Sequence, residues 1–113
     1  GISRLNLKIM VKTIGLKELQ KKKDEVILIE VLDPEQYNDF HIKGAINVPY
    51  KKIASEAEKK FKKDEEIVVY CSDSECQSSK IAADKLDDMG YENVWHYKGG
   101  KKEWKEAGLP VES

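Results

Sequence analysis

The stretch IVVYCSDSECQSSKIAADKLDDMG (67–90) contains one strand, one loop and one helix, and it decides the fold class. IVVYC (67–71) is a short apolar run rich in β-branched residues, which is typical of a strand covered on both faces. A polar loop follows. Residues 79–89 then place Ala82, Leu86 and Met89 on one helical face, and Gly90 stands where a helix commonly ends.

The same alternation extends in both directions along the chain. VILIEV (26–31) and NVWHY (93–97) predict two more buried strands, and AINV (45–48) predicts a fourth that Pro49 ends. Helices are predicted at residues 13–23, with Thr13 as the N-cap, at 34–40, at 50–62, and after Gly99-Gly100 around Trp104. Strands that alternate with helices predict an α/β fold: three layers, with a mostly parallel central sheet and helices on both faces.

Size and composition narrow the class of protein. The 113 residues fit one domain, 1–113, with a core at about 12–112. Basic residues (20) and acidic residues (21) nearly cancel, so we expect neither a nucleic acid nor a membrane as partner. GISRLNLKIM (1–10) lacks a signal-peptide pattern, although a leader or fused domain removed earlier stays open. Two cysteines are too few for a disulfide scaffold, so we expect a cytoplasmic protein. We also expect a monomer.

Cys71 occupies the position where chemistry is expected. Binding sites of open α/β sheets lie beyond the carboxyl ends of the strands, and Cys71 ends one of them. The polar loop after it would present backbone N–H groups near a helix N-terminus, which lowers the pKa of a thiol. By position alone, a reactive thiolate and an inert buried cysteine are equally good interpretations.

Three segments, in order, carry a resemblance to a known family. LIEVLDPEQYNDFHIKGAINVPY (28–50), IVVYC (67–71) and GYENVWHYKGGKKEWKEAGLPVE (90–112) together resemble the rhodanese-like sulfurtransferases. The resemblance implies an enzyme that takes sulfane sulfur from a small donor or a persulfidated protein. It holds that sulfur as a cysteine persulfide on Cys71 and passes it to cyanide, a thiol or a protein. It implies no metal and no organic cofactor.

The resemblance also implies a binding site around Cys71. Backbone amides of the loop would stabilise the persulfide, since preorganised dipoles favour a developing anion. Lys98, which precedes Gly99-Gly100, would attract a negatively charged donor. The loop residues concerned are Ser72, Asp73, Ser74, Glu75, Gln77 and Ser78.

The loop itself departs from the family pattern C-x-x-G-x-R-S. It is longer, contains no Gly or Arg, and follows a C-x4-C-x2-S variant with a second cysteine, Cys76. The missing Arg removes a forked partner for sulfonate oxygens, and Asp73 and Glu75 repel anions. We therefore expect weak use of thiosulfate and favour a persulfide, a polysulfide or a protein donor.

Cys76 has three possible roles. In the first role it is a resolving thiol, which attacks the Cys71 persulfide or forms a reversible disulfide with Cys71. In the second role Cys76 is itself the nucleophile. In the third it packs inertly at the helix start. A zinc site is not expected from two ligands of one loop. Two further functions compete with sulfur transfer: a non-catalytic module that binds a partner protein, and a Cys71/Cys76 dithiol redox switch. A phosphatase ranks below these because the loop has no Arg.

Other polar residues have ordinary structural roles in this interpretation. We expect His41 to fix a turn through a backbone hydrogen bond, and His96 to have a core or surface role. Asp33 and Glu35 are expected to cap a helix and to match its dipole.

Overall fold

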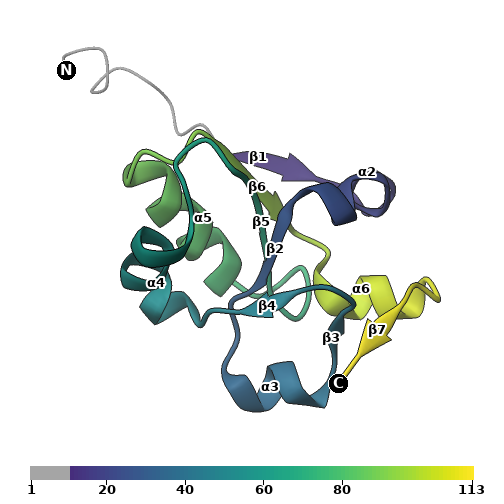
Figure 1. Ribbon diagram of the computed structural model, residues 1–113. Helices are drawn as coiled ribbons and strands as arrows, with labels where there is room; N and C mark the ends of the chain where they lie inside the picture. Colours follow the sequence, from purple (N-terminus) through teal and green to yellow (C-terminus); the bar gives the residue numbers. More distant parts are fainter. Residues whose placement is uncertain (1–10) are drawn as a thin grey trace.

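Five parallel strands form the central sheet, in the order β1-β6-β5-β2-β4 (Figure 1). The structure is a computed structural model that describes residues 11–113. The strands are β1 (Lys12–Ile14), β2 (Ile27–Glu30), β4 (Ile46–Asn47), β5 (Glu66–Tyr70) and β6 (Asn93–Tyr97). Every neighbouring pair is parallel, so the predicted α/β fold is confirmed.

Helices cover both faces of this sheet. In Figure 1, α4 and α5 lie on one side of it, and α2 and α6 lie on the other. The helices are α2 (Leu16–Lys22), α3 (Pro34–Asp39), α4 (Ile53–Lys60), α5 (Ser78–Asp88) and α6 (Gly100–Glu106), with 3₁₀ turns η1 (Lys23–Glu25) and η2 (Tyr50–Lys52).

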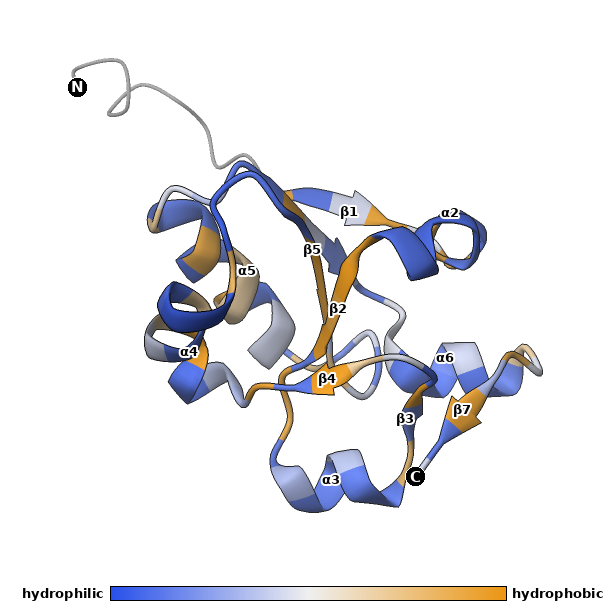
Figure 2. Ribbon diagram, in the orientation of Figure 1, coloured by the Kyte–Doolittle hydropathy of each residue, from blue (hydrophilic) through white to orange (hydrophobic). Residues whose placement is uncertain are grey.

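The central strands are apolar because each of their faces meets a helical layer. Ile67 and Val69 of β5 belong to the cluster that includes Ala57 of α4 and Ala82 of α5. Val68, between them, belongs to the cluster on the opposite face. Figure 2 shows this as apolar colour along β2 and β5 and mostly polar colour on the helices. Each fully buried branched side chain of this kind contributes about 1.5–3 kcal/mol to folding.

The prediction for Thr13 is wrong. Thr13 lies in β1, where it pairs with His96 of β6, and its side chain is exposed. Gly15, not Thr13, precedes α2 as its N-cap residue. KTI (12–14) is too short to show a strand period, and its conformation follows from the edge of β6, a partner far away in the sequence.

The remaining differences concern short elements. β3 (His41–Ile42) and β7 (Val111–Glu112) form a separate antiparallel ribbon that was not predicted, since two-residue strands have no recognisable pattern. The helix expected at 50–62 consists of η2 and then α4. The predicted end of α5 is confirmed, because Gly90 follows it with φ +98°.

Among the described residues, none of the helices combines the length and the apolar character needed to cross a bilayer. The expectation for residues 1–10 lies outside the part of the chain that the structure describes.

Candidate active site

Cys71 lies at the carboxyl end of the middle strand of the sheet. β5 ends at Tyr70, and Cys71 is the next residue. β6 and β2 flank β5 on its two sides, so the loop 71–77 starts at the centre of the sheet edge. α5 begins at Ser78, which places the loop directly before a helix N-terminus, as predicted.

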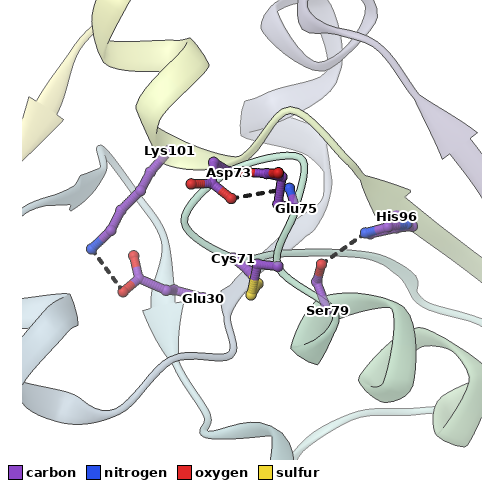
Figure 3. Close-up of a disulfide and its surroundings, with 8 residues drawn as sticks. Glu30, Cys71, Asp73, Glu75, Ser79, His96 and Lys101 are labelled. Carbon is purple, nitrogen blue, oxygen red and sulfur yellow. Dashed lines mark hydrogen bonds and ion pairs between the residues drawn. A yellow bond between two sulfur atoms is a disulfide. The ribbon is translucent and has the colours of Figure 1, made fainter.

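A disulfide joins Cys71 to Cys76 (Figure 3). Their Cα atoms are 6.2 Å apart. Cys71 is 1% exposed and packs in the core cluster with Val31 and Val69, whereas Cys76 is half-buried at the edge of that cluster. The pairing favours a sulfur-related role for Cys76 over inert packing at the start of α5.

Asp73 organises the loop through two backbone amides. The Glu75 N–H donates to Asp73 Oδ1 at 3.0 Å, and the Cys76 N–H donates to the Asp73 carbonyl oxygen at 3.3 Å. In the disulfide form these two amides therefore serve the turn. Asp73 was expected to contribute a backbone amide and to repel anions, and its side chain also shapes the loop.

Backbone amides at the N-terminus of α6 hydrogen-bond to the beginning of the loop. The Lys101 N–H donates to the Cys71 carbonyl oxygen at 3.0 Å, and the Lys102 N–H donates to that of Ser72 at 2.9 Å. Gly100 has φ +74°, and a Cβ atom there would lie 2.6 Å from the carbonyl carbon and oxygen of Ser72. A residue with a side chain would displace the loop, so this close approach requires glycine.

A buried ion pair connects α6 with β2 of the sheet. Lys101 Nζ lies 3.1 Å from Glu30 Oε2, and the two residues are 4% and 0% exposed. The Lys101 ammonium also donates to the carbonyl oxygens of Gln36 and Phe40, at 2.6 Å each. The Tyr70 hydroxyl donates to Glu30 Oε1 at 3.0 Å. These bonds satisfy both charges, as burial of an ion pair demands.

Burial and the neighbouring Lys101 have opposite effects on the pKa of Glu30. Burial raises the pKa of the Glu30 carboxyl, and the hydrogen bond and charge of Lys101 oppose that rise. Sequence reasoning missed the pair. The available signal was a charged residue, Glu30, inside the apolar run VILIEV (26–31), where only a paired charge is tolerated.

A second polar pair lies on the other side of the disulfide (Figure 3). Ser79 Oγ and His96 Nε2 share a hydrogen bond of 2.7 Å, and both residues are buried. Burial lowers the pKa of the His96 ring, and the charge of Lys80 lowers it further. Of the core and surface roles left open for His96, the structure shows the core one, with Ser79 as the partner that the sequence did not reveal.

His41 has the structural role that was predicted. Its Nδ1 atom lies 2.8 Å from the Tyr37 carbonyl oxygen, and its ring stacks on the Tyr37 ring at 3.7 Å. Asp33 occupies the N-cap position of α3, but its side chain makes no capping bond. Its carbonyl oxygen instead accepts from the Gln36 and Tyr37 amides.

Two cavities beside the loop are lined by side chains of opposite charge. One cavity of about 490 Å³ is lined by the carboxylates of Asp73, Glu75, Glu103 and Glu106, with Lys102 beside them. Another, of about 260 Å³, is lined by Cys76, His96, Lys80 and Lys98, and no carboxylate lines it. Lys98 is exposed. Because it lines the same cavity as Cys76, it lies on the Cys76 side of the loop.

Within residues 11–113, no group of three or more His, Cys, Asp or Glu side chains is arranged to hold a metal ion.

Comparison with known proteins identifies the family. A model of the family described as Rhodanese-like domain matches residues 15–107. The chain belongs to the rhodanese-like domain family. It is 32% identical over 88 residues to a thiosulfate sulfurtransferase, GlpE, of Coxiella burnetii, an alignment that covers 78% of each chain.

Other relatives in the family have different names and lengths. The chain is 36% identical over 97 residues to the HTH-type transcriptional regulator Rv0324 of Mycobacterium tuberculosis, covering 84% of this chain and 42% of the regulator. The chain spans about half the length of two of its curated relatives. Among solved structures, the BH2092 protein of Bacillus halodurans is similar with a TM-score of 0.83 and 27% identity, over 99% of this chain and 84% of that one.

Proposed function

We propose that this rhodanese-like domain is a sulfurtransferase that carries sulfane sulfur as a persulfide on Cys71. The observation that carries the proposal is the position of Cys71, directly after β5 at the centre of the sheet edge and at the start of a loop that leads into α5. Cys76 Sγ is bonded to Cys71 Sγ in this structure, so the disulfide must be reduced before Cys71 can accept sulfur. The similarity to a thiosulfate sulfurtransferase supports the same reaction class.

The reaction has two displacement steps. The Cys71 thiolate attacks the outer sulfur of a donor persulfide, so the bond between Cys71 Sγ and that sulfur forms while the donor S–S bond breaks. The donor leaves as a thiolate. An acceptor thiolate then attacks the outer sulfur on Cys71, and Cys71 departs as a thiolate. The loop that begins at Cys71 leads into the N-terminus of α5, and helix N-termini favour negative charge close to them. No metal or organic cofactor takes part in these steps.

Thiosulfate is the less favourable donor in this proposal. It carries two negative charges, and one cavity beside the loop is lined by four carboxylates. The chain also has no Arg in the loop to form a forked pair with sulfonate oxygens. A thiol persulfide or a persulfidated protein is the expected donor, and a thiol, cyanide or protein is the acceptor. A monomeric state and a cytoplasmic location stay predictions.

A dithiol redox switch is the second candidate, because the disulfide itself favours it. This function needs reversible oxidation of Cys71 and Cys76 but no bound sulfane sulfur. A non-catalytic module that binds a partner protein also stays open. It would leave Cys71, once reduced, with a thiol pKa near its ordinary value of about 8.5.

The test is a sulfur-transfer assay on protein whose disulfide has first been reduced. Glutathione persulfide and thiosulfate are compared as donors, with a thiol as acceptor. The proposal expects transfer by the wild-type protein from the persulfide, and transfer by Cys76→Ser, but none by Cys71→Ser. Transfer by Cys71→Ser at the wild-type rate contradicts it. If neither donor supports transfer while the disulfide forms and opens reversibly, the redox switch replaces it.

A further inference from the structure

We propose that the cavity lined by Cys76, His96, Lys80 and Lys98 binds a small, carboxylate-bearing thiol, which opens the disulfide by attack on Cys76. Cys71 is then released as the free thiolate. The cavity thus binds a defined class of ligand, and reduction of the disulfide begins at Cys76. This reduction produces the reactive form and precedes any sulfur transfer.

Access to the two sulfur atoms differs. Thiol–disulfide exchange requires the attacking thiolate to approach one sulfur from the side opposite to the other. Attack on Cys71 Sγ would therefore come through the core cluster, where Cys71 is 1% exposed and packs with Val31 and Val69. Cys76 is half-buried and lines an open cavity of about 260 Å³. Cys76 therefore borders a cavity that can admit a small thiol, whereas Cys71 is buried.

The charges around the loop favour an anion in this cavity. Among the described residues, no hydrogen bond or ion pair engages the Lys98 ammonium. Lys80 also lines the cavity, although its ammonium is partly neutralised by Asp84 at 2.8 Å. The larger cavity on the other side of the loop is lined by four carboxylates and repels an anion. A thiol that carries carboxylates is therefore directed to the Cys76 side.

The direction of attack decides which thiolate leaves. Attack on Cys76 expels Cys71, which lies between the end of β5 and the loop that leads into α5. The thiolate released in this way is the one that the proposed sulfur transfer requires.

The electron balance is simple. The attacking thiolate forms a bond to Cys76 Sγ, and the Cys71–Cys76 bond breaks with its electron pair on Cys71. A second molecule of the small thiol attacks the mixed disulfide, leaves as the oxidised small disulfide, and releases Cys76 as a thiolate that takes a proton from water. The protein is reduced by two electrons, and two small thiols are oxidised.

The test uses the oxidised full chain and no sulfur donor, so its failure is distinct from failure of the proposed sulfur transfer. Glutathione is the anionic probe, 2-mercaptoethanol the neutral probe and cysteamine the cationic probe. The reaction is quenched with an alkylating reagent, and peptide mass spectrometry locates the mixed disulfide. The inference expects glutathione on Cys76 and the alkyl group on Cys71.

Lys98→Gln tests the cavity, and Lys102→Gln is the matched control on the acidic side of the loop. Lys98→Gln is expected to slow opening by glutathione about two- to fivefold and to leave 2-mercaptoethanol unaffected, as removal of one exposed charge does. Lys102→Gln is expected to change neither rate. Added salt should reduce the preference for glutathione over cysteamine. A mixed disulfide on Cys71, or equal sensitivity of the two lysine variants, overturns the inference.

Discussion

Individual residues around the disulfide differ sharply in burial, and this decides what each can do. In the disulfide form Cys71 is buried in the core, and Cys76 lines a cavity. Ser79 and His96 share a hydrogen bond, and His96 lines the same cavity as Cys76. The burial of His96 affects the stability of the fold.

His96 makes stability depend on pH. Burial lowers the pKa of its ring below the ordinary 6.5, so the unfolded chain binds a proton at a pH where the folded chain does not. The free energy of unfolding should therefore fall as the pH is lowered through about 6.5 and continue falling until the folded ring also protonates. Urea unfolding at a series of pH values measures this.

His96→Gln is the variant that isolates this effect. It should lack the part of the decrease that begins near pH 6.5. Glu30 acts with the opposite sign, because its raised pKa makes the folded state hold a proton above pH 4.5 and so favours folding at lower pH. Glu30 is present in both proteins, so the difference between the two curves reports His96. Identical curves would show that His96 does not carry the dependence.

Gly100 is a position at which a side chain would meet the backbone of the loop. In Gly100→Ala the new Cβ meets the Ser72 carbonyl, so we expect displacement of the loop in addition to backbone strain. The matched control is Gly108→Ala. Gly108 has a similar φ of +77° but nothing within 4 Å of its Cβ position. The control should lose about 1–2 kcal/mol of stability through strain alone.

Reactivity separates the two glycine variants. The rate at which reduced Cys71 is alkylated should change in Gly100→Ala and stay at the wild-type value in Gly108→Ala. Unfolding in urea gives the accompanying stability difference. Equal effects of the two substitutions on the alkylation rate would mean that the contact between α6 and the loop does not shape the site.

At the scale of elements, α6 connects the loop with the sheet. Its backbone amides hold Cys71 and Ser72, and its Lys101 side chain reaches Glu30 at the end of β2. The helix therefore couples the position of the loop to a buried charge.

Lys101→Met tests this coupling. The substitution leaves Glu30 buried without a cation, and loss of one partner of a buried pair costs about 3–5 kcal/mol. The pKa of Glu30 should rise further, so the loss should be largest at neutral pH and should shrink as the pH falls toward 4.5. Urea unfolding at two pH values measures both effects.

The double variant Glu30→Gln, Lys101→Met is the control. It removes both charges and still lets the Tyr70 hydroxyl donate to residue 30, so it should recover part of the lost stability. Recovery is incomplete because the Gln36 and Phe40 carbonyl oxygens lose their donor. A single variant that loses less than about 1 kcal/mol would show that the pair is not a stabilising connection.

At the scale of the whole molecule, the disulfide closes only a short loop. Its separation of five residues restricts the unfolded chain modestly, by about 2 kcal/mol in the chain-entropy description. Reduction should lower the free energy of unfolding by about that amount without unfolding the domain. Cys71→Ser, Cys76→Ser provides the control, because a reductant should not change its unfolding curve. Complete unfolding on reduction would make the disulfide a structural requirement instead.

Much of the fold was predictable because its core strands and helices have local patterns. NVWHY (93–97) was predicted as a strand with the bounds that β6 has. The position of Cys71 after β5 followed in the same way. What could not be predicted depends on contacts between distant residues: Thr13 pairs with His96, Glu30 with Lys101, and Ser79 with His96. The disulfide was one of several open alternatives, because spacing alone does not show whether the two sulfur atoms meet.

The intact mass of the reduced protein after exposure to glutathione persulfide tests the assignment of the persulfide to Cys71. We expect a gain of one sulfur atom by the wild-type protein and by Cys76→Ser, and no gain by Cys71→Ser. A sulfur adduct that persists in Cys71→Ser and disappears in Cys76→Ser would contradict the assignment of the persulfide to Cys71.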